Sequence, residues 1–242
     1  EKEKFTKPVS IPSAPSERLN SLFQADWATK EISQPLLVNF TTYLADKEHI
    51  FWLSREGFFF RSDSSGKNQE KLSQVQFPIK EGVNYRLIGK FPNVLLHEGE
   101  NLYLFDQESK SFKQLSAHGT HFSFSPDSKK LVYWNNYEIW ILFLEEKLDQ
   151  PQKKPGEEIF LTRFSEKIGD CFWWTAHYLI FNAGDKIKIA EIDDRDKINI
   201  IDLSFAKAKI GLKNPKMFWN QLDKKLYILS ENKFLGSDRL MP

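Results

Sequence analysis

The sequence predicts an all-β protein built from a repeated unit of strands. Five short apolar runs recur along the chain, and each begins 37 to 48 residues after the one before it. Aromatic residues make up 14% of the chain, with 21 Phe and only two Met, a composition that suits half-buried pleated strands. A strand repeat of about 40 to 50 residues is typical of a β-propeller, in which each repeat forms one blade. We therefore expect about five four-stranded blades; the apolar runs begin at Ile50, Val94, Leu131, Leu179 and Leu226.

Residues 1–35 predict a short irregular or helical lead-in to the propeller, which then occupies residues 36–242. Three prolines among the first fifteen residues indicate an extended chain. Glu17–Trp27 fits a short helix, because its apolar residues recur at helical spacing and Ser16 suits the N-cap. Propellers often close when a terminal strand completes the last blade and so removes exposed sheet edges. We expect a strand from residues 4–35, with Lys4–Ile11 as the candidate, to complete the last blade.

The strands expected for each blade are apolar runs bounded by turn residues. The first two blades comprise Leu36–Tyr43, His49–Arg55, Gly57–Asp63 and Lys71–Phe77, then Tyr85–Phe91, Val94–His97, Asn101–Asp106 and Ser111–Leu115. The third and fourth comprise Thr120–Ser125, Lys130–Trp134, Glu138–Leu144 and Ile159–Phe164, then Asp170–Trp174, Tyr178–Asn182, Lys186–Ile192 and Ile198–Leu203. The fifth has only Met217–Asn220, Lys225–Leu229 and a degraded Lys233–Leu240, so its fourth strand is missing.

Two turns and one long loop connect strands of the third and fourth blades. Pro126–Lys129 has the Pro and Asp residues that preset and cap a tight reversal. Asp193–Asp196 is a polar turn between two apolar strands. Glu146–Glu158 is a long polar loop with two prolines, a length often associated with function or mobility. We interpret this loop as a solvated connection between two strands.

Charge and composition exclude several classes of function. The 34 basic and 33 acidic residues give a net charge of +1, so no overall field favours nucleic acid. We interpret Lys153-Lys154 and Lys224-Lys225 as solvated turns rather than phosphate contacts. No apolar run reaches the roughly 18 residues that a membrane span requires, so no direct membrane insertion is expected. The chain starts at Glu1 without a signal pattern, and we expect it to be a piece of a longer protein, with any anchor upstream.

The single cysteine, Cys171, excludes an intramolecular disulfide. It lies in an apolar strand pattern and is expected to fill core space, because free Cys is among the most buried residue types. No nucleophile elbow, phosphate-binding Gly-rich loop or dinucleotide motif occurs. We therefore assign no catalytic, cofactor-binding or metal-binding residue and expect no cofactor; the binding residues stay open.

The remaining polar residues and the aromatic pairs each have a structural explanation. His118 and His121 lack the spacing of a zinc protease and are interpreted as turn residues, and His49, His97 and His177 fall at separate strand starts. Asp193, Asp194 and Asp196 offer oxygen ligands for Ca²⁺, but the turn interpretation is preferred. Sialidase-like chemistry needs converging arginines, and Arg55, Arg61, Arg86, Arg163 and Arg195 occupy different repeat positions. Trp173-Trp174 and Phe218-Trp219 are expected to pack between blades, with neighbours facing opposite sides.

One motif resembles a known group of propellers. Phe124–Tyr133 is similar to the blade motif of TolB-type, WD40-like propellers, with Ser128 in place of the usual Gly. Three further stretches resemble the propeller region that follows PEGA domains in bacterial envelope proteins; they are Asn136–Trp140, Leu161–Ile168 and Glu191–Asn199. The resemblance covers roughly residues 45–230. It implies a propeller displayed outside the cytoplasm and tethered upstream, and it supplies no catalytic residues.

Because the repeats are complete and no catalytic motif is present, the sequence favours a binding or structural role over catalysis. We expect a non-enzymatic module for protein or peptide recognition or structural display, with a protein or peptide partner and no nucleic acid. We expect it at the cell surface or outside the cytoplasm, as part of a longer envelope protein, although a cytoplasmic location stays open. The alternatives are a hydrolase or lyase with a charged site at one end of the channel, and an accessory domain that is inert alone.

Overall fold

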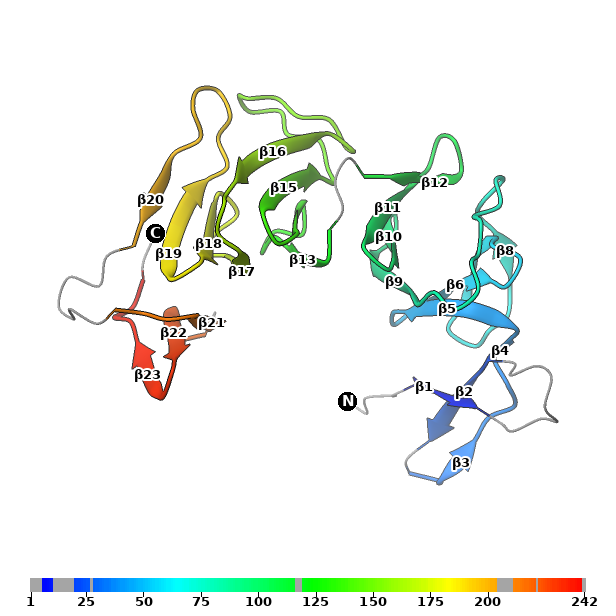
Figure 1. Cartoon of the computed structure of the whole chain (residues 1–242). Helices are drawn as coiled ribbons and strands as arrows, with labels where there is room; N and C mark the ends of the chain where they lie inside the picture. Colours follow the sequence, from blue (N-terminus) through cyan, green and yellow to red (C-terminus); the bar gives the residue numbers. More distant parts are fainter. Residues whose placement is uncertain are drawn as a thin grey trace. The chain divides into compact units, whose positions relative to one another are not determined.

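The computed structural model describes residues 6–10, 20–26, 28–115, 119–203, 211–220 and 222–240. Within these ranges all regular secondary structure is β, in six antiparallel sheets of three or four strands. The all-β prediction is confirmed, and sheets of this size and topology are those of propeller blades. The chain divides into two compact units, Glu1–Leu115 and Ser116–Pro242, which are coloured blue to green and green to red in Figure 1.

The first sheet of unit 1 replaces the helix expected at Glu17–Trp27. Its strands are β1 (Thr6–Ser10), β2 (Asn20–Asp26), β3 (Glu31–Ile32) and β4 (Leu37–Val38). The helix prediction is wrong over β2, while residues 17–19 and Trp27 lie outside the described part of the chain. β2 pairs with β1, β3 and β4, and Leu22 is buried beside Leu37. Completion of the last blade by Lys4–Ile11 and a boundary at residue 35 stay predictions.

The next two sheets of unit 1 match the first two expected blades. One sheet consists of β5 (Phe40–Ala45), β6 (His49–Ser54), β7 (Phe59–Asp63) and β8 (Glu70–Lys71), in that order. The other consists of β9 (Tyr85–Lys90), β10 (Asn93–Glu98), β11 (Asn101–Asp106) and β12 (Ser111–Gln114). Aromatic rings fill the space between them, with the Phe59 centroid 4.9 Å from that of Phe105. These rings stabilise the stack of sheets through burial and edge-to-face contact.

Unit 2 contains the three remaining sheets. The first has β13 (His121–Phe124), β14 (Lys130–Trp134), β15 (Glu138–Phe143) and β16 (Glu158–Arg163). The second has β17 (Ile168–Trp173), β18 (Tyr178–Ala183), β19 (Lys186–Glu191) and β20 (Ile200–Asp202). The third has β21 (Lys216–Asn220), β22 (Lys225–Ser230) and β23 (Lys233–Gly236), so it contains three strands among the described residues.

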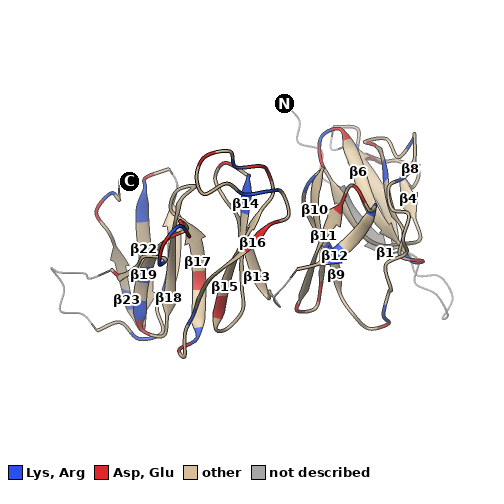
Figure 2. Ribbon diagram, turned by 90° about the horizontal axis from the view of Figure 1, so that it is seen from above, with Lys and Arg blue, Asp and Glu red and all other residues tan. Residues whose placement is uncertain are grey.

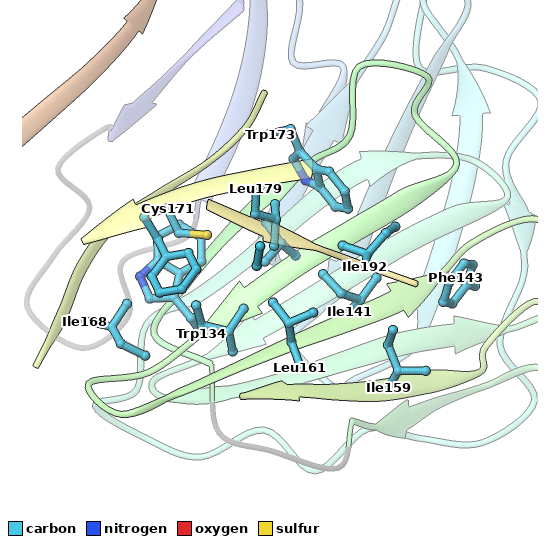
Figure 3. Close-up of a cluster of buried hydrophobic side chains, with 14 residues drawn as sticks. Trp134, Ile141, Phe143, Ile159, Leu161, Ile168, Cys171, Trp173, Leu179 and Ile192 are labelled. Carbon is cyan, nitrogen blue, oxygen red and sulfur yellow. The ribbon is translucent and has the colours of Figure 1, made fainter. Parts of the chain in front are cut away.

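The main core of unit 2 lies between its first two sheets (Figure 3). Trp134 and Trp173 reach across in opposite directions: their indole N–H groups donate to the carbonyls of Gly169 and Ser123, each at 2.9 Å. Cys171 is buried in the same cluster, as the sequence predicted. Both tryptophans thus combine apolar burial with a satisfied polar group, which fixes how the two sheets face each other.

The adjacent aromatic pairs face opposite sides of their sheets, as expected. Trp173 packs in the core between the first two sheets, whereas Trp174 packs against the cluster between the second and third. In the third sheet Trp219 joins that same cluster, but Phe218 is 54% exposed. Blade packing therefore explains three of the four residues, and Phe218 lies on a face that no described residue of unit 2 covers fully.

Candidate functional site

A tight turn positions a buried lysine at one end of the β13–β16 sheet. Ser128 has a φ of 59°, the left-handed conformation for which the related motif uses Gly. Oδ1 of Asp127 accepts a hydrogen bond from the Lys129 backbone N–H at 3.1 Å, and Oδ2 lies 2.9 Å from Nζ of Lys130. Burial would raise the pKa of Asp127, but hydrogen bonds from Ser125 and Lys130 outweigh it and lower the pKa. Lys130, only 6% exposed, is thereby held in place.

The loop between β15 and β16 is anchored rather than fully solvated. Lys153 is only 9% exposed, which makes the expectation of a solvated turn wrong at this residue. Its Nζ lies 2.9 Å from Oε1 of Glu157 in the same loop and 2.7 Å from Oδ2 of Asp194 in the loop after β19. Burial alone would lower the pKa of Lys153, but the hydrogen bonds to both carboxylates outweigh it and raise the pKa. The ammonium therefore stays charged and joins the two loops.

A cavity of about 290 Å³ lies beside this anchored loop, within unit 2. Its apolar walls include Phe143, Pro151 and Ile192, and the rest of its surface is polar or charged. Figure 2 shows Lys and Arg close to Asp and Glu in the loops at the ends of these sheets. The full lining comprises Lys130, Phe143, Lys147, Pro151, His177, Tyr178, Glu191, Ile192 and Asp193.

The charged groups around the cavity are held by partners from the chain itself. Nζ of Lys147 donates to the Pro151 carbonyl at 3.1 Å, and the Tyr178 hydroxyl donates to Oε1 of Glu191 at 3.2 Å. The bond to Glu191 raises the pKa of Tyr178. Asp193 accepts from Nε of Arg195 at 3.0 and 2.9 Å, and this pairing lowers the pKa of Asp193 to about 2. Both acidic lining residues are thus hydrogen-bonded.

One buried acceptor at the edge of the cavity has no hydrogen-bond partner among the described residues. Oδ1 of Asp194 is buried and accepts no hydrogen bond within the described part of the chain, although Oδ2 of the same carboxylate binds Lys153. A buried acceptor without a donor is unfavourable, so a donor from water or a ligand would satisfy it. Its neighbour in the chain, Asp193, lines the cavity.

The structure separates most residues that the sequence analysis weighed as a site. His118 lies outside the described residues, and His121 stacks on Trp134 with ring centroids 5.4 Å apart. Burial raises the pKa of Cys171, which disfavours its thiolate. No cluster of three or more metal-ligating residues occurs among the described residues. Asp193 is paired with Arg195, and Asp194 is paired with Lys153.

The arginines do not share one partner. In unit 1, Arg61 pairs with Glu70 at 2.6 Å. In unit 2, Arg163 pairs with Glu138 at 3.1 Å and Arg195 pairs with Asp193. The roles of Lys130 and Lys153 were not predicted from the sequence: Lys130 is held by Asp127 three residues away in a tight turn, and Lys153 is held by Asp194 from a loop 41 residues along the chain. The length of the Glu146–Glu158 loop was the one available signal.

The chain is similar to known proteins in fold only. No known family matches the sequence, and no curated protein matches it. Hsv2 of Kluyveromyces lactis with a complete loop 6CD is 12% identical, with a TM-score of 0.50 over 92% of this chain and 68% of that chain. The extracellular domain of BT4673 from B. thetaiotaomicron is 12% identical, with a TM-score of 0.49 over 90% of this chain and 31% of that chain. YCF48 bound to a D1 peptide is 14% identical, with a TM-score of 0.41 over 90% and 70%.

At this level of identity the comparison with Hsv2 establishes the fold alone. Hsv2 is a propeller protein, and the match extends over most of the present chain. The blade architecture expected from the strand repeat is therefore supported by an independent structure. In addition, no helix within the described residues is long and apolar enough to cross a membrane.

Proposed function

We propose that this chain is a non-enzymatic recognition module that binds a segment of a protein or peptide in the cavity beside the Glu146–Glu158 loop. The cavity is the observation that carries the proposal, because it combines apolar walls with charged groups already held in fixed positions. Its volume of about 290 Å³ is near the lower end of the range for small-molecule sites, roughly 300–1,000 Å³. One or two side chains of a partner would fill it.

The hydrogen bonds around the cavity favour binding over chemistry. A general acid or base works best with a pKa near the operating pH. The pKa of Asp193 is about 2, and its pairing with Arg195 leaves it ionised and occupied at neutral pH. Such a carboxylate serves better as a fixed acceptor for a partner's N–H groups. Glu191 is also occupied, because its Oε1 accepts a hydrogen bond from the Tyr178 hydroxyl at 3.2 Å.

One observation favours the alternative, a hydrolase or lyase. His177, Glu191 and Asp193 line the same cavity, so an imidazole and two carboxylates converge on one space. Turnover of a substrate that depends on His177 and Glu191 would support this alternative over simple recognition.

We also propose that the chain is part of a longer, tethered envelope protein. This rests on the resemblance of three sequence stretches to PEGA-associated propellers.

The proposal can be tested by selecting peptides from a random heptapeptide phage library on the intact chain. The selected peptides are then titrated by calorimetry into Lys147→Glu and Tyr178→Ala variants. Tyr137→Ala is the matched control, because Tyr137 is 43% exposed and does not line the cavity. We expect the two cavity variants to weaken binding by about tenfold or more, equivalent to about 1.4 kcal/mol, and the control to bind normally. Selected peptides that bind all variants equally would contradict the proposal.

A further inference from the structure

Lysines and carboxylates line the cavity beside the Glu146–Glu158 loop, and the chain itself neutralises one of each. Nζ of Lys130 lies 2.9 Å from Oδ2 of Asp127. Asp193 accepts from Nε of Arg195 at 3.0 and 2.9 Å. Each of these two pairs carries no net charge, so neither requires an opposite charge from a partner.

Lys147 and Glu191 are the other lysine and carboxylate of the lining, and they have only neutral partners. Nζ of Lys147 donates to the Pro151 carbonyl, and Oε1 of Glu191 accepts from the Tyr178 hydroxyl. Neither forms an ion pair with any described residue, nor with the other. One positive and one negative charge therefore line the same cavity uncompensated. Such charges attract opposite charges more strongly in a cavity than on an open surface, because the effective dielectric is lower.

Both uncompensated charges stand on backbone that is held in place. Lys147 exchanges two backbone hydrogen bonds with Lys153, at 2.9 and 3.1 Å. Lys153 is in turn bound to Asp194 in the loop after β19, at 2.7 Å. Glu191 is the last residue of β19 and lies opposite Tyr178 of β18 in the strand register. Because these positions are fixed before a partner arrives, binding orders little of the chain and costs less entropy.

Apolar surface lies next to each uncompensated charge. Pro151, whose carbonyl holds Lys147, lines the cavity, and so does Ile192, which follows Glu191 in the chain. Phe143 completes the apolar part of the lining. Long charged side chains commonly lay their aliphatic stems on such surface while the charged end reaches a polar group. A cavity of about 290 Å³ has room for one or two of them.

We propose that the occupant of this cavity is a segment of a partner protein that presents one acidic and one basic side chain; this rests on the recognition function proposed above. The acid binds Lys147 and the base binds Glu191, each through a charge-assisted hydrogen bond. Their aliphatic stems lie on the apolar walls. A segment with two acids or two bases brings a like charge against one of these residues, so the cavity selects the mixed pair.

The first test selects heptapeptides by phage display on the natural chain and on two charge-reversal variants. The natural chain should enrich peptides that contain both an acid and a base. Lys147→Glu should replace the acid by a second base, and Glu191→Lys should replace the base by a second acid. Lys154→Glu and Asp196→Lys are the controls, because they reverse exposed charges in the same two loops outside the cavity lining. Both controls should select the same mixed peptides as the natural chain.

The second test reverses charges in the peptide, so it does not depend on the folding of a variant. Calorimetry measures the affinity of the natural chain for a selected peptide before and after Lys replaces its acid. We expect a loss of at least tenfold, and recovery of most of that loss when the reversed peptide meets Lys147→Glu. Recovery in one specific combination distinguishes a direct ion pair from a general effect of charge.

The outcomes separate this inference from the proposed function. Selected peptides that need the cavity but lack an acid or a base, or that tolerate charge reversal, would overturn the inference and leave the proposed function standing. Displacement of the peptide by free leucine at millimolar concentration would identify a free amino acid as the occupant and would also overturn it. Peptides that bind Tyr178→Ala and Lys147→Glu as well as the natural chain would overturn both.

Discussion

The Lys153 ammonium lies 2.7 Å from Oδ2 of Asp194 and joins two loops that are 41 residues apart in the sequence. One loop follows β15 and the other follows β19, so this ion pair connects two neighbouring sheets of unit 2 at the edge of the cavity. The apolar core holds the two sheets together, and the Lys153–Asp194 ion pair holds together the loops at their ends. The shape of the cavity therefore depends on a pair that is largely withdrawn from water.

Replacement of Lys153 by Met should destabilise unit 2. The aliphatic stem is kept, but Asp194 and Glu157 lose their shared donor, and an unsatisfied buried acceptor costs about 1–3 kcal/mol. Urea unfolding of the variant measures this loss. Lys154→Met is the matched control, since Lys154 is exposed and should change stability by less than about 0.5 kcal/mol. Equal changes in unfolding free energy for both substitutions would show that the ion pairs of Lys153 add no stability of their own.

Replacement of Arg195 by Gln should raise the pKa of Asp193. Hydrogen bonds from Arg195 hold this pKa at about 2, and without them it should move toward the ordinary value of about 3.9. Carboxylate ¹³C shifts followed from pH 2 to 6 report the change. Arg163→Gln removes an arginine that pairs with Glu138 and should leave the Asp193 titration where it was. An unchanged pKa of Asp193 in the Arg195 variant would show that Arg195 does not lower it.

Unit 1 should lose stability at both low and high pH through one buried cluster. Glu98 is 3% exposed and accepts from the hydroxyls of Tyr85 at 3.0 Å and Tyr103 at 2.8 Å, while Nζ of Lys80 lies 3.0 Å away. Burial would raise the pKa of Glu98, but these bonds outweigh it and lower the pKa. Burial, and then the bond to Glu98, raise the pKa of Tyr103 to about 12.

The stabilising contributions of Glu98 and Tyr103 depend on pH in opposite directions. Because the folded pKa of Glu98 is lowered, its stabilisation is present above the unfolded pKa of about 4.3 and is lost as pH falls through the folded value. Because the folded pKa of Tyr103 is raised, its stabilisation is present below about pH 10 and is lost as pH rises toward 12. Unfolding free energy measured across pH should therefore decline at both ends. Glu98→Gln should flatten the acid decline, whereas Glu100→Gln, at an exposed turn position, should leave it unchanged.

Replacement of Ser128 by Gly should stabilise the protein. Ser128 has a φ of 59°, and a left-handed conformation costs a residue with a Cβ roughly 1–2 kcal/mol. Gly has a more flexible unfolded state, so we expect a net gain of about 0.5–1 kcal/mol, visible as a higher urea midpoint. Ser128→Ala keeps the Cβ and should give no such gain. A lower midpoint for the Gly variant would mean that the Ser128 side chain supports the turn.

The strand repeat was predictable because burial on both faces makes whole strands apolar. All five residues of β14 are buried, and the range expected for it matches the structure. The edge of the first blade was less predictable: β8 is only Glu70–Lys71, since the chain then turns so that the Ser73 hydroxyl accepts from the Phe59 N–H at 2.9 Å. A side-chain bond of this kind leaves no trace in the apolar pattern.

The prediction of an N-terminal helix was wrong, and the cavity was not predicted, for different physical reasons. The adjacent apolar residues Leu22 and Phe23 fit a helix or a strand equally well, and pairing of β2 with β1 and β4 decided the outcome. In the sequence Lys153 resembles any polar loop residue, because its burial depends on Asp194, which lies in the loop after β19. Local composition predicts a strand well, but it carries little information on which loops meet at the end of two sheets.

The most direct test of recognition at the cavity is hydrogen exchange of the intact chain with and without a peptide selected from the heptapeptide library. We predict added protection in three segments that surround the cavity, at residues 145–157, 177–178 and 191–195, with the strands of unit 1 unchanged. Protection elsewhere in the chain, or none at saturating peptide, would contradict the assignment of this cavity as the recognition site.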